Sequence, residues 1–222
     1  MVELFTSEGC SSCPPADETL AAIAALAERD GQRVYALELH VDYWNDLGWI
    51  DPFSSPAYSE RQRAYAEAFG LRGIYTPQMV VNGHEEFVGS RGYLARDAIT
   101  RALATPAKVR VAVHATRGSA PTLIRVAYDV GPTEPVDLHL AVAIDRAETR
   151  VTRGENANQL LKHRHVVLAF ETRRIAAAER GQWLAAWPAS AGALAAFVVA
   201  YVSDPRTLAI AGADGTTLPA TD

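Results

Sequence analysis

The sequence lacks the features that mark several large classes of protein. It contains no run of lysine or arginine that would follow a nucleic-acid backbone, and its 21 basic and 26 acidic residues give a net charge of −5. Its apolar stretches are interrupted well before the roughly 20 residues that a membrane span needs. We therefore expect neither a nucleic-acid partner nor a membrane span. Hydrophobic residues at 49% and charged residues at 21% are typical of a globular chain.

A targeting segment is also missing from the start of the sequence. A secretory signal carries a basic stretch, then roughly 7–15 apolar residues and a cleavage site of small residues. Here Met1 leads directly into residues 2–5, which have the pattern of a strand. Either the protein is made without a signal or a signal has been removed, so localisation stays open.

Cysteine is scarce, and its spacing is informative. Only Cys10 and Cys13 are present, separated by two serines. No other cysteine completes a four-thiolate zinc site, and so short a loop gains little stability from a disulfide. The Cys-x-x-Cys pair therefore favours redox or metal chemistry over a structural role.

The first hundred residues predict alternating strands and helices. Residues 2–6 form a strand, and the prolines 14–15 followed by acidic residues are typical of a helix N-terminus, with the helix ending at Gly31. Asn82-Gly83 predicts a hairpin turn. The other expected elements are strands over 34–42, 77–81 and 86–88, and helices over 57–69 and 93–103. This β-α-β-α-β-β-α order, with the dithiol at the first strand-to-helix junction, is the thioredoxin arrangement.

The pattern changes after Pro106. Apolar residues alternate with polar ones over 109–113, 123–128 and 136–144, and further apolar runs occupy 196–202 and 208–211. We therefore expect a thioredoxin-like α/β domain over residues 1–106, followed by a mostly antiparallel, sandwich-like β domain over residues 107–222.

The dithiol suggests a division of roles. A helix N-terminus lowers a thiol pKa, because backbone N–H groups and the positive end of the helix dipole favour the thiolate. Cys10 precedes the expected helix, which makes it the candidate for an exposed attacking thiol. Cys13, near the N-cap, is then the resolving thiol.

Two further positions belong to the same expected catalytic region. In thioredoxin-like folds a cis-proline before the third strand faces the dithiol and holds an extended substrate, and Thr76-Pro77 stands at that place. A trans proline at the start of an edge strand is the alternative. Glu3, on the strand leading to the dithiol, is a candidate acceptor for the Cys13 proton, although a solvent-facing carboxylate is the more usual explanation for an acid in a strand.

Other candidates surround these positions. Trp44 and Trp49 lie in a long loop and could cover the dithiol or form a substrate groove, or simply pack beneath the loop. His40 and Asp42 are expected to be structural hydrogen-bonding residues in that region. In the second half, a polar group could complete the site or form an ordinary capped turn; its members are Glu155, Asn156 and His163.

Several stretches resemble one bacterial family. They are residues 2–17, 40–53, 61–63, 75–81 and 89–90, and a C-terminal pattern of Gly154-Glu155-Asn156 with Leu161, His163 and Val166-Val167. Together they resemble the thioredoxin-like domain-of-unknown-function family 1223. The resemblance implies the thioredoxin fold, assigns no reaction, and implies an exported or periplasmic protein.

Three functions are consistent with these features. The first is a thiol–disulfide oxidoreductase that acts on a protein or small-molecule disulfide through Cys10 and Cys13, with Pro77, Thr76 and the tryptophans binding substrate and without an organic cofactor. The second is a metal-handling protein in which both cysteines bind Cu(I) and His40 or His163 completes the site. The third is a binding module without catalysis.

Overall fold

The computed structural model describes residues 1–221 as two compact units. Unit 1 comprises Met1–Ala104 and Arg146–Val166, and unit 2 comprises Thr105–Asp145 and the chain from Val167 onward. Two long strands, β7 (Val136–Arg150) and β8 (Leu160–Ile175), contribute residues to both units. The segment carrying Glu155, Asn156 and His163 therefore belongs to the same unit as the dithiol.

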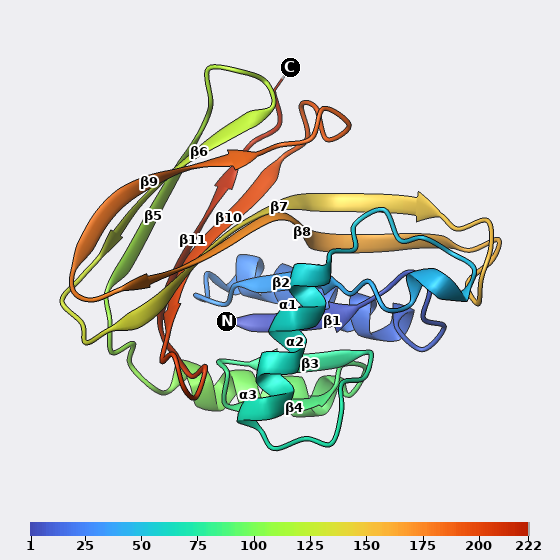
Figure 1. Ribbon diagram of the computed structural model, residues 1–222, viewed down its shortest axis with the longest axis horizontal. Helices are drawn as coiled ribbons and strands as arrows, with labels where there is room; N and C mark the ends of the chain where they lie inside the picture. The colour runs from blue at the N-terminus through green and yellow to red at the C-terminus, as the bar shows by residue number, and fades with distance from the viewer. Residues whose placement is uncertain (222) are drawn as a thin grey trace. The chain divides into compact units, whose positions relative to one another are not determined.

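Unit 1 contains the thioredoxin-like arrangement that the sequence predicts (Figure 1). Its elements are β1 (Val2–Thr6), α1 (Pro14–Asp30), β2 (Ala36–His40), the short 3₁₀ helix η1 (Asn45–Leu47), α2 (Pro56–Ala68), β3 (Gln78–Val81), β4 (Glu85–Val88) and α3 (Gly92–Leu103). The strand order is β8-β2-β1-β3-β4. β1 runs parallel to β2 and antiparallel to β3, which pairs with β4 as a hairpin.

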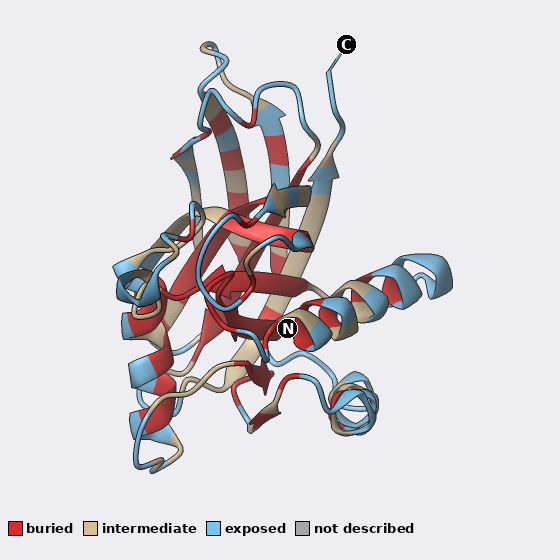
Figure 2. Ribbon diagram, turned by 90° about the vertical axis from the view of Figure 1, so that its right-hand side faces the viewer, coloured by how far each residue is buried: buried red, intermediate tan, exposed pale blue. Residues whose placement is uncertain are grey.

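Alternation along β1 separates the two faces of this sheet. Val2 and Leu4 pack with apolar residues of α1 and α3 in one core cluster. Phe5 points to the opposite face, where its ring meets that of Tyr65 in α2 at 6.0 Å. The helices accordingly carry a buried and an exposed side (Figure 2). Both faces of β1 and β2 are covered, and all their residues are buried.

The ends of α1 follow from the local sequence. Prolines fit its first turn because those backbone positions have no intrahelical acceptor, and Cys13 is the N-cap residue. Gly31 ends the helix in the left-handed conformation at φ 63°, where its N–H bonds back to the last turn. The proline pair thus fixes the helix start immediately after Cys13.

Unit 2 is antiparallel, as expected for the second half of the chain. One sheet has the order β5-β6-β9, from β5 (Val111–Arg117), β6 (Leu123–Val130) and β9 (Glu179–Ala186). β10 (Ala196–Ser203) pairs with β7 and with β11 (Ile210–Leu218). The sequence analysis predicted neither β8 nor β9. The first half of β9, residues 179–182, holds only polar residues and glycine, which are depleted in strands, and its apolar residues are confined to 183–186. Over residues 1–221, no helix is long and apolar enough to cross a membrane.

Candidate functional site

Cys10 and Cys13 form a disulfide in the loop between β1 and α1, with Cα atoms 5.4 Å apart. The Cys13 amide donates to the Cys10 carbonyl at 3.1 Å, which closes a tight turn. The Cys13 carbonyl then accepts the amides of Ala16 and Asp17, which begins the helix. The dithiol thus lies at the strand-to-helix junction that its spacing predicts.

Both cysteines are fully buried, so the expectation of an exposed Cys10 is wrong for the disulfide form. The reason lies in the segment before β8. Asn156 Nδ2 donates to the carbonyls of Glu8 and Cys10, at 2.9 and 3.0 Å. Glu155 Oε2 accepts the Ser11 amide at 2.9 Å, and hydrogen bonding from the Ser11 side chain, together with this amide bond, lowers the Glu155 pKa. The sequence pattern alone was consistent with a site role or with an ordinary turn for these side chains, and in the structure both bind the dithiol loop directly.

Trp44 connects the dithiol loop to the loop before β3. Its indole Nε1 donates to Thr76 Oγ1 at 2.8 Å. A Cβ at Gly9 would lie 3.1 Å from Trp44 Cβ, so the tryptophan packs closely against the residue before Cys10. The Thr76–Pro77 bond is cis, which confirms that prediction. Trp44 and Thr76 are therefore held together beside the dithiol loop.

Glu3 lies elsewhere. Its carboxylate is buried and accepts two hydrogen bonds from Arg61, at 2.6 and 3.0 Å, and one from Tyr65 at 2.5 Å. Arg61 and Tyr65 belong to α2, on the opposite face of the sheet from α1. The position of Glu3 therefore supports neither a role beside Cys13 nor the alternative of a surface carboxylate.

A buried cluster of carboxylates and imidazoles occupies the α1 face near the end of β2. His40 Nδ1 lies 2.7 Å from Asp51 Oδ2, and its Nε2 lies 3.5 Å from Glu38 Oε2. Asp51 also accepts the amides of Glu8 and Phe53, at 2.8 and 2.9 Å. Asp42 is separate from this cluster and accepts the Ser59 hydroxyl. His40 is thus a hydrogen-bonding residue, as expected, and its partner is Asp51.

His163 joins the same cluster from β8. Its Nδ1 lies 3.2 Å from Glu38 Oε2 and 3.9 Å from Asp17 Oδ2, and its Nε2 lies 3.3 Å from Glu8 Oε1. Glu8 Oε2 accepts the indole N–H of Trp49 at 2.8 Å. Trp49 therefore binds a cluster residue, whereas Trp44 binds the cis-proline loop.

Burial and mutual attraction shift the protonation of these groups. Burial, together with the charge of Glu38, raises the pKa of Asp17 to about 8 despite a 2.6 Å hydrogen bond from Thr6. Burial opposes charge on His163, but the carboxylates of Glu38 and Glu8 outweigh it and raise the His163 pKa to about 9. Burial also opposes charge on His40 and Glu38, but attraction to their neighbours outweighs it. Asp51 and Glu38 raise the pKa of His40, and His163 and His40 lower the pKa of Glu38. The cluster therefore stabilises both imidazolium and carboxylate charges.

Sequence analysis missed four members of the cluster: Glu8, Asp17, Glu38 and Asp51. Glu38 did carry a signal, because it shares a face of the predicted strand with His40. Asp17 follows Cys13 by one helical turn. The other two lie in loops, where residue spacing gives no direction for a side chain.

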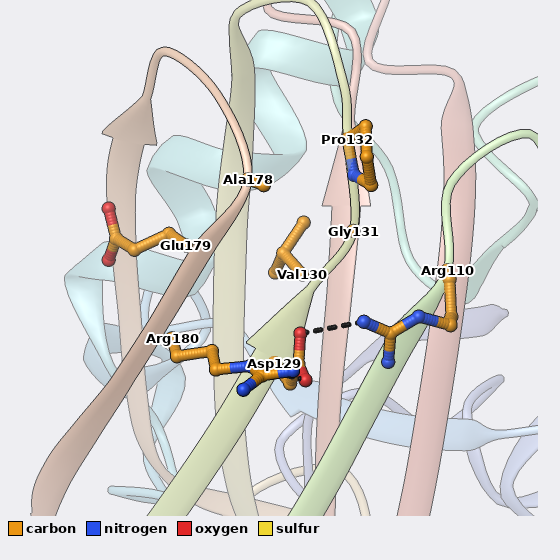
Figure 3. Close-up of a pocket in the computed structure, with 8 residues that line it drawn as sticks. All are labelled: Arg110, Asp129, Val130, Gly131, Pro132, Ala178, Glu179 and Arg180. Carbon is orange, nitrogen blue, oxygen red and sulfur yellow. Dashed lines mark hydrogen bonds and ion pairs between the residues drawn. The ribbon is translucent and has the colours of Figure 1, made fainter.

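Unit 2 has a concave surface lined by the end of β6, the start of β9 and Arg110 (Figure 3). Asp129 lies 2.8 Å from both Arg110 and Arg180, and Glu179 accepts the Tyr128 hydroxyl. None of the residues lining it is a cysteine or histidine. This surface contains none of the predicted site residues.

Comparisons with known proteins agree with the sequence resemblance. The model of the family "Protein of unknown function (DUF1223)" matches residues 1–202. An X-ray crystal structure of a protein from Agrobacterium tumefaciens is similar over 100% of this chain and 94% of its own, with 29% identity and a TM-score of 0.67. No curated protein matches. Since the family model spans most of its length, the chain belongs to the DUF1223 family, with a thioredoxin-like fold and a Cys10–Cys13 disulfide.

Proposed function

We propose that this protein is a thiol–disulfide oxidoreductase that works through Cys10 and Cys13. The observation that carries the proposal is the Cys10–Cys13 disulfide at the N-terminus of α1 in a thioredoxin-like unit. The helix N-terminus favours the thiolate form of a nearby cysteine in the reduced protein. The adjacent Thr76–Pro77 loop and Trp44 are the proposed binding elements for substrate.

The proposed reaction is a two-step exchange. The reduced Cys10 thiolate attacks a substrate disulfide, forms a mixed disulfide and releases one substrate thiolate. The Cys13 thiolate then attacks the Cys10 sulfur, which re-forms the Cys10–Cys13 bond and releases the second thiolate. The substrate gains two electrons and the dithiol loses them. An external thiol reductant restores the dithiol, and the thiol protons pass to the released thiolates through solvent.

Burial of the disulfide adds a requirement for access. Substrate reaches Cys10 only after the contacts over the loop loosen. Segment 154–156 supplies three hydrogen bonds to the loop backbone, one from Glu155 and two from Asn156. The Glu155 contact with Ser11 is exposed, so it costs little to break. We propose that segment 154–156 controls access to the dithiol.

Reduction of insulin by dithiothreitol, followed by turbidity, tests this function. The wild-type protein is expected to accelerate the reaction, and Cys10→Ser and Cys13→Ser are each expected to return it to the uncatalysed rate. Ser119→Ala is the matched control, because it removes an exposed hydroxyl in unit 2 and leaves both thiols and the dithiol loop in place. A wild-type rate equal to background, or a Cys10→Ser variant as active as wild type, contradicts the proposal.

A further inference from the structure

We propose that Glu38, His40 and His163 form a binding site for one divalent transition-metal ion, separate from the dithiol. All three side chains are fully buried, and one ligand atom from each lies within 4.8 Å of the others. β2 supplies Glu38 and His40, and β8, its parallel neighbour, supplies His163. The site goes beyond the proposed redox function, which needs no metal.

The spacing of the ligand atoms suits a small ion. Glu38 Oε2 lies 3.5 Å from His40 Nε2 and 3.2 Å from His163 Nδ1. Tetrahedral zinc with bonds of about 2.0–2.1 Å separates its ligand atoms by about 3.3–3.4 Å. Asp17 Oδ2, 3.9 Å from His163 Nδ1, is the neighbouring carboxylate that can approach as a further ligand.

The three ligand atoms lack hydrogen bonds in the described structure. Glu38 Oε2, His40 Nε2 and His163 Nδ1 are all buried, and none has a hydrogen-bond partner of acceptable geometry, although Glu38 Oε2 lies within ion-pair distance of both ring nitrogens. A buried polar atom without a well-formed hydrogen bond is unfavourable. Three such atoms facing one another are what a bound cation would satisfy.

The far nitrogens of both imidazoles lie beside carboxylates. His40 Nδ1 is 2.7 Å from Asp51 Oδ2, and His163 Nε2 is 3.3 Å from Glu8 Oε1. Metal-binding histidines commonly donate their second ring N–H to a carboxylate, which fixes the tautomer and aims the other nitrogen at the metal. Asp51, which hydrogen-bonds His40 Nδ1, is therefore a positioning residue that leaves His40 Nε2 as the available lone pair. Glu8 is the neighbouring carboxylate for His163, whose two ring nitrogens both lack a hydrogen bond.

The donor set indicates the class of metal. Two imidazoles and a carboxylate suit Zn²⁺, Co²⁺ or Fe²⁺, whereas Cu(I) prefers sulfur ligands. Over residues 1–221, neither group of potential metal ligands includes a cysteine. The proposed site differs from the copper site considered from the sequence, which used both cysteines and one histidine, because it holds no sulfur and uses both histidines.

Cobalt titration of the chelator-treated full chain, with the disulfide kept oxidised, tests the proposal. We expect visible d–d absorption that saturates at about one Co²⁺ per chain, without thiolate-to-cobalt charge transfer, and competition by Zn²⁺. His40→Ala, His163→Ala and Glu38→Gln should each weaken Co²⁺ binding by more than about 100-fold. The controls are His84→Ala and His114→Ala, which remove exposed imidazoles and should bind as wild type.

Two further measurements keep the test decisive if a buried variant fails to fold. X-ray absorption of the zinc-loaded wild type should show nitrogen and oxygen ligands with scattering from two imidazoles. Asp51→Asn should weaken Co²⁺ binding by about 10–100-fold and keep the two-imidazole signature. No saturable binding by the wild type, sulfur in its ligand shell, or unchanged affinity in folded His40→Ala and His163→Ala overturns the site. Cys10→Ser/Cys13→Ser should still bind metal, which separates this result from the redox proposal.

Discussion

Asn156→Ala tests whether segment 154–156 holds the dithiol loop. The Asn156 side chain donates to the Glu8 carbonyl at 2.9 Å and to the Cys10 carbonyl at 3.0 Å, and the residue is 3% exposed. The Cys10 carbonyl also accepts the Cys13 amide, so losing its hydrogen bond from Asn156 costs only about 0.5–1.5 kcal/mol. The Glu8 carbonyl loses a buried bond, which costs about 1–3 kcal/mol. The free energy of unfolding of unit 1 should therefore fall by about 1.5–4.5 kcal/mol.

Hydrogen exchange of the β1 and β2 amides measures this loss within unit 1. The same variant should be reduced faster by dithiothreitol, because the Cys10 end of its loop is released. Gln159→Ala is the control, since it removes an exposed amide side chain three residues after Asn156 and should leave both measurements unchanged. A loss below about 0.5 kcal/mol with an unchanged reduction rate refutes the account of Asn156 as the anchor of the dithiol loop.

Three further substitutions separate stability from redox chemistry. Glu3→Ala removes the buried carboxylate that pairs with Arg61 and accepts the Tyr65 hydroxyl, and it should cost about 3–5 kcal/mol in urea unfolding followed by β1 hydrogen exchange. The dithiol reduction potential should stay unchanged. Gly89→Ala should cost about 1–3 kcal/mol in the same assay, because its Cβ would lie 2.7 Å from Leu4 Cδ1; a neutral result would show that this contact relaxes. Glu155→Gln weakens the exposed, charge-assisted contact with Ser11. It should raise the rate of disulfide reduction by dithiothreitol severalfold, with little loss of stability. An unchanged rate would exclude this contact from access control.

The sequence was sufficient to predict the framework of unit 1. The proline pair and Gly31 define α1, and the Asn82-Gly83 turn defines the β3–β4 hairpin, because these residues act on the backbone locally. The dithiol position and the cis bond at Thr76–Pro77 followed from that framework. Local backbone chemistry is the part of a fold that spacing alone reveals.

The buried cluster was harder to predict because it depends on contacts distant in sequence. Glu8 meets His163 from 155 positions away, and Glu38 meets it from 125, as the numbering shows. A carboxylate in a strand pattern normally indicates a solvent-facing position. Glu3 and Glu38 are both exceptions, since each is buried against a partner that the sequence pattern could not identify.

The most direct test of the redox role is to trap the mixed disulfide. Reduced Cys13→Ser protein is incubated with a peptide disulfide, and the adduct is located by mass spectrometry after digestion. The proposed reaction predicts a stable adduct on Cys10, since the resolving thiol is missing, and none on Cys13 of the Cys10→Ser variant under the same conditions. No adduct on Cys10, or preferential adduct formation on Cys13, would contradict the proposed roles of the two cysteines.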